Sequence, residues 1–289
     1  AYDKTIEHTT RQVEKYLREW GYQGLKIDGQ HLNGVAECHN PKHNHKRPEE
    51  SVEKLQDFWK AVYDTALGVD KETVVEICPC GTSYSFFNVP YMNQSVSSDP
   101  LSSWQVRLKG KTLKGLAGES APYYGDHVEL SDGGDDFAST YGIGGVVGTK
   151  FTLPSDNEAA EQYLMTPEKE AEWSKWIALY KEKMLPKGEY LGELYDIGFD
   201  RPEAHAVAKD GSIHYAFYAE EFSGEVELRG LDAGHYRVVD TVTGKVLGTV
   251  EGPVATIDAN FEQYLLLEAR KIPRPDGFYS LEDFAYTNK

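Results

Sequence analysis

Two aspartates that follow predicted strands could form a catalytic pair. Asp28 ends the apolar segment 25–28, and Asp99 follows the segment 93–98 and precedes a predicted helix. Because reactive groups of a parallel α/β fold gather at the carboxyl ends of its strands, both carboxylates should lie on one edge of the sheet. Such a pair suits glycoside hydrolysis, in which one carboxylate attacks the anomeric carbon and the other shuttles the proton. Two simpler interpretations stay open: a strand-end ion pair for Asp28 and a helix cap for Asp99.

Lys26 should project beside Asp28. Side chains at positions i and i+2 of a strand point to the same face. A lysine next to a carboxylate lowers the pKa of that carboxylate and keeps it ionised, as a nucleophile must be. The segment 26–28 (KID) is therefore a candidate nucleophile with its supporting cation.

Cys78 and Cys80 end the predicted strand between the two aspartates, in the segment 76–81 (EICPCG). A C-x-C pair could bind a metal or do redox chemistry, but a zinc site of this kind needs a matching second pair. A role in a pocket wall is the better interpretation. With Cys38 the chain has three cysteines, which do not make a disulfide framework.

Two other polar segments resemble metal sites. Residues 31–47 contain four histidines together with Glu37 and Cys38, namely His31, His39, His43 and His45. Their spacing fits no regular metal site, and a loop over a sugar pocket needs polar groups in any case, so the question of a metal there stays open. The acidic run 131–136 lacks the spacing and the terminal glutamate of a calcium-binding EF-hand and indicates a solvated turn.

Strands and helices alternate along residues 1–186, which predicts β/α units with a parallel sheet. The expected helices are 5–20, 51–67, 101–116 and 157–184, and the expected strands are 25–28, 73–78, 93–98, 122–130 and 138–151. From residue 187 the chain has short alternating segments separated by Gly, Asp and Asn, typical of an antiparallel β-sandwich of about seven strands. The predicted domains are 1–186 and 187–289.

The composition excludes several classes of protein. The chain has 289 residues, of which 40% are hydrophobic and 12% aromatic, so it is a folded protein with a sizeable core. The formal charge of −17 repels nucleic acid. No stretch approaches the roughly 18 uncharged apolar residues that a membrane-spanning helix needs. We therefore expect neither a nucleic-acid partner nor a membrane partner.

Several motifs in order resemble the melibiase group of α-galactosidases, glycoside hydrolase family 36 and its clan relatives. These motifs are 20–28 (WGYQGLKID), 76–81 (EICPCG), Ser98-Asp99 with a following Arg107, 125–128 (GDHV) and 146–149 (VVGT). The resemblance implies that Asp28 is the nucleophile, that Asp99 is the acid/base and that Lys26 binds a sugar hydroxyl. It also implies a sugar subsite lined by Cys78, Cys80 and Gly81, with Trp104, Arg107 and His127 as further candidate ligands. No cofactor and no metal are expected.

Other functions remain open at this point. The segments 80–84 and 100–102 depart from the family pattern, which leaves the exact sugar undetermined. A non-catalytic carbohydrate-binding protein on the same scaffold and a transglycosylase of the same clan are the alternatives. In each case the partner is an oligosaccharide or glycoside. A polysaccharide-degrading enzyme would favour a secreted or periplasmic location.

The resemblance covers residues 5–155 as strands 4–8 of a (β/α)8 TIM barrel, and the C-terminal sandwich matches the closing domain of the family. The N-terminal sandwich and barrel strands 1–3 of the family have no counterpart in this sequence. We therefore expect the missing N-terminal half of the enzyme, or another chain, to cover the open barrel edges.

Overall fold

The computed structural model describes residues 3–29, 36–81, 84–149 and 164–273. The chain divides into two compact units. The N-terminal unit comprises residues 1–140 and 145–165, and the C-terminal unit comprises residues 141–144 and 166–289. The predicted domains 1–186 and 187–289 do not coincide with these units, and they stay a prediction.

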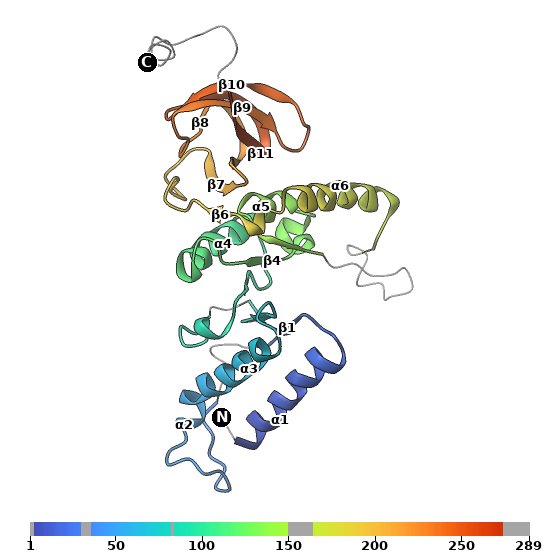
Figure 1. Ribbon diagram of the computed structural model, residues 1–289, viewed down its shortest axis with the longest axis vertical. Helices are drawn as coiled ribbons and strands as arrows, with labels where there is room; N and C mark the ends of the chain where they lie inside the picture. The colour runs from blue at the N-terminus through green and yellow to red at the C-terminus, as the bar shows by residue number, and fades with distance from the viewer. Residues whose placement is uncertain (1–2, 30–35, 82–83, 150–163, 274–289) are drawn as a thin grey trace, which may run out of the picture. The chain divides into compact units, whose positions relative to one another are not determined.

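The N-terminal unit contains short parallel strands that follow one another in chain order (Figure 1). Strand β1 pairs with β2, strands β3, β4 and β5 pair in that order, and a parallel bridge between Glu76 and Gln94 connects β2 to the residue before β3. The strands are β1 (Gly24–Ile27), β2 (Val74–Ile77), β3 (Ser95–Val96), β4 (Tyr123–His127) and β5 (Val146–Gly148). Parallel neighbours need crossover connections, and helices supply most of them. The carboxyl ends of these strands therefore meet at one edge.

The helices of this unit begin and end close to the expected positions. They are α1 (Asp3–Glu14) with a π-helical continuation (Lys15–Glu19), α2 (Glu50–Glu53), α3 (Leu55–Val69), α4 (Ser103–Ala117) and α5 (Phe137–Gly142), with 3-10 turns at Val89–Tyr91 and Val128–Gly133. The apolar positions that predict α1 and α3 form one core with β1 and β2. Helix α4 is capped by Ser102, whose hydroxyl accepts a hydrogen bond from the Gln105 amide at 3.2 Å. Asp99 is therefore not the cap of this helix.

The expected strand 138–151 is wrong in its first half, which forms α5 before β5 begins. Phe137 and Tyr141 lie four residues apart and are both buried, which is helical spacing. The Asp136 carboxylate accepts a hydrogen bond from the Ser139 amide at 3.0 Å and so stabilises the start of the helix. Gly144, with φ of 62°, ends the helical segment before the chain enters β5. Residues 137–145 are all buried, so the sequence in this segment has no polar face from which a helix could be told from a strand.

The C-terminal unit consists of helix α6 and one antiparallel sheet. Helix α6 (Pro167–Lys183) begins at the cap Thr166, later than the expected residue 157; residues 157–163 lie outside the described part. A 3-10 turn (Leu185–Lys187) follows, and the sheet order is β10-β9-β11-β8-β7-β6. Its strands are β6 (Glu189–Tyr190), β7 (Glu203–Lys209), β8 (Ser212–Glu227), β9 (Gly234–Asp240), β10 (Val246–Gly252) and β11 (Thr256–Ile272).

The expected sandwich of about seven short strands differs from this sheet, because β8 and β11 are long strands of 16 and 17 residues. Figure 1 shows both strands in the C-terminal unit. The register of β11 against β8 shifts between Glu262 and Gln263, where Gln263 has φ of 64°. Such a bulge bends a strand without ending it. Buried residues from both halves of β8, Phe217 and Val226, belong to one hydrophobic core. The long strands therefore curve around a single core.

In the described part of the chain, no helix has the length and apolar character needed to cross a bilayer.

Candidate active site

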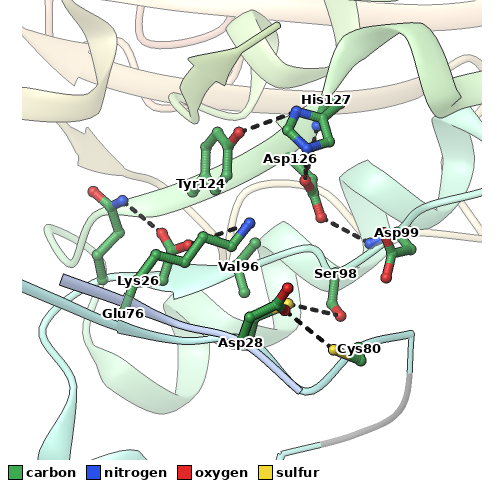
Figure 2. A network of polar contacts seen from close by, with 12 residues as sticks. Lys26, Asp28, Glu76, Cys80, Val96, Ser98, Asp99, Tyr124, Asp126 and His127 are labelled. Carbon is green, nitrogen blue, oxygen red and sulfur yellow. Dashed lines mark hydrogen bonds and ion pairs between the residues drawn. The ribbon is translucent and has the colours of Figure 1, made fainter. Parts of the chain in front are cut away.

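Both predicted aspartates lie at carboxyl ends of strands in the N-terminal unit (Figure 2). Asp28 follows β1 directly, and Asp99 follows β3 after two serines. Both residues are exposed. Ser98 and Asp99 have left-handed backbone conformations, with φ of 61° and 48°. Two successive residues in this region are costly for side chains other than glycine, and such strain gathers at functional sites.

The loop after β2 connects the two aspartates through short polar contacts. The Cys80 thiol donates to Asp28 Oδ1 at 3.1 Å, and Cys78 Sγ lies 3.5 Å from Ser98 Oγ. The Gly81 amide donates to the same Ser98 hydroxyl at 2.6 Å. Ser98 immediately precedes Asp99. The structure therefore brings together the predicted Asp28, Cys78, Cys80, Gly81 and Asp99. Figure 2 shows Asp28, Cys80, Ser98 and Asp99 of this group.

Hydrogen bonds from the two thiols lower the pKa of Asp28 below its usual range, with Cys80 contributing most and Cys78 next. Lys26 contributes the smallest of the lowering effects. The expected lowering of the Asp28 pKa by Lys26 is therefore present, but the thiols and the Gly29 amide lower it more. Burial raises the pKa of Cys78 to about 11, so its thiol keeps the proton that it donates. Asp28 is an ionised carboxylate held by neutral donors.

Lys26 instead lies between Glu76 and Tyr124. Its Nζ is 3.9 Å from Glu76 Oε1 and 5.3 Å from the centre of the Tyr124 ring. Glu76 is the cross-strand partner of Lys26 and is only 3% exposed. Gln94 Nε2 donates to the other Glu76 oxygen at 2.7 Å. Burial raises the pKa of Glu76 to about 7 despite these two partners, because desolvation outweighs them.

Glu76→Gln should remove one loss of stability that accompanies rising pH. The folded state holds the Glu76 proton more tightly than the unfolded chain, whose pKa is near 4.5. Unfolding therefore releases this proton between pH 4.5 and 7, and the contribution of Glu76 to the free energy of unfolding falls as the pH rises through this window, by about 3 kcal/mol in all. Urea unfolding at pH 5 and pH 8 should show a more favourable change from pH 5 to pH 8 in Glu76→Gln than in the wild type and in the exposed control Glu72→Gln, which share all other titrating groups. The same change in Glu76→Gln and in the wild type would contradict it.

Asp126 is a site residue that the sequence reasoning did not single out. Its buried carboxylate accepts hydrogen bonds from the Asp99 amide at 2.7 Å and from the His127 amide at 3.0 Å. His127 Nε2 lies 3.5 Å from Asp126 Oδ1. The other ring nitrogen of His127 lies 3.5 Å from the Tyr124 hydroxyl. Asp126 thus holds the Asp99 turn and the predicted ligand His127 in one network (Figure 2). The segment 125–128 (GDHV), which contains Asp126, was the signal in the sequence.

Lys109 of α4 is a second residue outside the predicted set. Its ammonium donates to the Ser97 carbonyl at 2.6 Å and to the Ser98 carbonyl at 3.2 Å. These two bonds hold the left-handed turn that carries Asp99. Helix α4 therefore positions Asp99 through a lysine.

Trp104 and Arg107 lie on α4 outside this network. Trp104 is 47% exposed in the first turn, and Arg107 is buried and donates to the Ser139 hydroxyl of α5 at 2.7 Å. Their sugar-binding roles stay predictions. In the acidic run 131–136, Asp132 accepts a hydrogen bond from the Ser103 amide at 2.9 Å, and Asp136 accepts one from the Ser139 amide. These two carboxylates therefore bind backbone amides in the first turns of α4 and α5.

Two groups of side chains could hold a metal ion in the described residues, Asp28–Cys78–Cys80 and Cys38–His43–His45. In the first group the Cys80 thiol donates a hydrogen bond to Asp28. The second group lies in the histidine-rich loop. His39 lies outside both groups and pairs with Glu37 at 3.6 Å, and His31 falls outside the described residues.

Known proteins similar to this chain are glycosidases. The chain is 34% identical over 297 residues to the A type blood alpha-D-galactosamine galactosaminidase of Flavonifractor plautii. The chain resembles the α-galactosidase group of glycoside hydrolases. The alignment covers 97% of this chain but 26% of that protein, so the chain spans about a quarter of the length of this relative. No family model matches the chain.

Solved α-galactosidases share the fold of this α-galactosidase-like chain. The family 36 α-galactosidase of Geobacillus stearothermophilus, in complex with stachyose, matches with a TM-score of 0.64 at 16% identity over 93% of this chain and 38% of that one. The α-galactosidase I of Mortierella vinacea matches with a TM-score of 0.57 at 12% identity over 92% of this chain and 72% of that one. These neighbours are TIM-barrel glycosidases. The predicted resemblance is confirmed, and the large antiparallel sheet is consistent with a C-terminal β domain.

Proposed function

We propose that this chain is the part of a retaining glycoside hydrolase that carries both catalytic carboxylates, with an α-linked galactose or galactosamine residue as substrate. The observation that supports this most is the polar connection from Asp28 through the Cys78–Gly81 loop to Ser98 and Asp99 at the carboxyl ends of β1 and β3. The similarity to a galactosaminidase supports the choice of sugar. The substrate partner is a glycoside or oligosaccharide.

Asp28 is the proposed nucleophile and Asp99 the proposed acid/base. The ionised Asp28 carboxylate attacks the anomeric carbon while the Asp99 carboxyl group protonates the departing glycosidic oxygen. The resulting glycosyl ester on Asp28 is then hydrolysed by a water whose proton returns to Asp99. This mechanism needs carboxyl groups about 5–5.5 Å apart, and we expect that separation in the complete barrel.

Lys26, Cys78, Cys80 and Gly81 are the proposed sugar-binding residues nearest to this pair. The contacts of Lys26 with Glu76 and Tyr124 fix where its ammonium group can meet a hydroxyl. His127 is held by Asp126 and Tyr124 on the same side of the site. Trp104 and Arg107, on α4 outside this network, are further candidate sugar-binding residues.

We propose further that the parallel strands are strands 4–8 of the barrel. In the described residues β1 pairs only with β2, and β5 pairs only with β4. A closed barrel of this kind has eight strands, and an unpaired edge is normally covered. Beside β1 lies a cavity of about 680 Å³, lined by the apolar rings of Trp20 and Tyr22 and reaching Asp28. Strands from the N-terminal half of the enzyme, or from another chain, would cover this edge and complete the sugar subsite.

The 289-residue chain alone should therefore be a weak catalyst. Missing subsite residues lower binding of the transition state even when both carboxylates are present. The test assays an aryl α-galactoside and an aryl α-galactosaminide with the chain alone and after addition of a separately produced N-terminal half. We expect activity to rise at least about 100-fold on addition. Full activity of the chain alone would contradict the proposed strand assignment.

A non-catalytic carbohydrate-binding fragment is the second candidate, and the unpaired edge of β1 favours it for the chain by itself. Binding of galactose or galactosamine without turnover, after the N-terminal half has been added, would support this candidate against the enzyme.

A further inference from the structure

Cys38, His43 and His45 come together in the loop between β1 and α2. One ligand atom from each of the three lies within 4.8 Å of the other two. Cys38 Sγ is 3.0 Å from His43 Nδ1, and the two imidazole rings lie 6.0 Å apart at 82°. All three residues fall in the described segment 36–50. A soft sulfur and two imidazole nitrogens therefore face one small volume.

The loop holds two of these residues through its backbone and a neighbouring amide. The Cys38 amide donates to the Ser51 hydroxyl at 3.1 Å and to the Pro48 carbonyl at 3.2 Å, which ties Cys38 to the start of α2. The Asn40 side chain contacts His43 Nε2 at 3.2 Å. This contact occupies the outer ring nitrogen of His43 and turns Nδ1 toward Cys38. Partners of this kind orient metal-binding histidines.

His45 gives an independent indication of a missing ligand. Its Nε2 is buried and has no hydrogen-bond partner among the described residues, although the side chain as a whole is half-buried. Buried polar atoms are nearly always paired, and an unpaired one calls for a bound ion or another explanation. A metal ion among the three side chains would satisfy this nitrogen.

We propose that Cys38, His43 and His45 bind one Zn²⁺ ion, with a water molecule as the fourth ligand. Thiolate and imidazole are the ligands that Zn²⁺ prefers, whereas Ca²⁺ and Mg²⁺ take oxygen. On binding, the Cys38 thiol loses its proton to solvent and forms the Zn–S bond, while both histidines bind as neutral rings. The C-x4-H-x-H spacing is irregular, so the sequence leaves the question open, and the fold selects these three residues from the histidine-rich loop.

The ion would act as a structural clamp. The loop follows Asp28, so it lies at the carboxyl end of β1, the face that carries the site in barrel enzymes. Because Zn²⁺ carries two positive charges and Cys38 supplies one negative charge, the site would contain no net negative charge. The proposal does not depend on the glycosidase function, because neither carboxylate takes part.

The test measures zinc bound to the full 289-residue chain. The chain is stripped with a chelator, titrated with Zn²⁺ against a competing indicator, and analysed for metal after dialysis. We expect about one tightly bound zinc per chain, and Co²⁺ in its place should give a thiolate-to-cobalt charge-transfer band. Cys38→Ser and His45→Gln should each weaken zinc binding at least about 100-fold.

Two control variants locate the ion. His39→Gln removes a neighbouring exposed histidine outside the group, and Cys80→Ser removes a thiol of the other candidate group; both should keep one zinc. Zinc loss in Cys80→Ser with retention in Cys38→Ser would move the ion to the Asp28 group and overturn the proposal. Binding of no zinc by the wild type would also overturn it.

A measurement without mutation covers the case in which Cys38→Ser fails to fold. Zinc should slow the alkylation of Cys38 by iodoacetamide at least about tenfold, as read by peptide mass spectrometry, while labelling of Cys80 stays the same. Equal labelling of Cys38 with and without zinc would overturn the proposal.

Discussion

Asp28→Asn is expected to abolish glycoside turnover, by about 10⁴-fold or more, while sugar binding stays measurable. Asparagine cannot form the covalent glycosyl intermediate. It keeps the shape of the side chain and an oxygen that can accept a hydrogen bond from the Cys80 thiol. The measurement compares kcat for an aryl α-galactoside with sugar affinity from calorimetry. Both are measured on the chain joined by the proposed N-terminal half.

The matched control is Asp64→Asn. Asp64 is an exposed aspartate on α3 that forms an ion pair with Lys60 of the same helix and not with a residue of the site. The chemical change is the same, and turnover should stay within about twofold because surface substitutions are mild. Retention of most of the activity in Asp28→Asn would exclude Asp28 as the nucleophile.

Asp99→Ala should slow the hydrolysis of substrates with poor leaving groups far more than that of substrates with good leaving groups. A sugar leaving group needs a proton from the acid, so its glycosylation step should lose about 10²–10⁴-fold, whereas an activated aryl leaving group departs without that proton. The measurement is kcat/KM for a natural α-linked disaccharide and for a nitrophenyl glycoside. The ratio of the two losses reports the acid role directly.

Equal losses on the two substrates would argue against Asp99 as the acid. Asp126→Asn is the informative comparison, because Asp126 accepts the Asp99 amide and is proposed to position it. Because Asp126 acts through Asp99, its loss should also slow the substrate with the poor leaving group more than the nitrophenyl glycoside, but by smaller factors than Asp99→Ala. Equal slowing of both substrates in Asp126→Asn would argue against a role of Asp126 in positioning the acid.

The sequence predicts the placement of the main site residues well. Strand ends of a parallel sheet meet at one edge, so order along the chain is enough to bring Asp28, Cys78 and Asp99 to the same region. The period of two along β1 places Lys26 on the face of Asp28. What the sequence leaves open is which neighbour each side chain meets. Lys26 contacts Glu76 across the strand pair, and the thiols take the place next to Asp28.

Asp126 and Lys109 could not be predicted because their roles depend on the turn at Ser98 and Asp99. A left-handed turn redirects the Asp99 amide toward Asp126 and the carbonyls of Ser97 and Ser98 toward Lys109. The sequence Ser-Ser-Asp-Pro does not specify such a conformation. Tertiary contacts select it.

The antiparallel sheet shows the same limit at larger scale. Gly224 in β8, and Asp258 and Asn260 in β11, indicate turns, yet both strands continue through them with a bulge at Gln263. Pairing over the whole length of the two strands outweighs the local preference for a turn. The sequence therefore predicts that this region forms β-strands, but it does not predict how many.

A covalent glycosyl adduct on Asp28 is the most direct test of the proposed mechanism. The chain, joined by its N-terminal half, is incubated with a slow galactose-configured substrate that has a good leaving group, then quenched in acid, digested and analysed by peptide mass spectrometry. The account predicts that the peptide containing residues 26–28 gains the mass of one glycosyl group and that Asp28→Asn loses this adduct. An adduct on a different carboxylate, or turnover with inversion and no adduct, would contradict it.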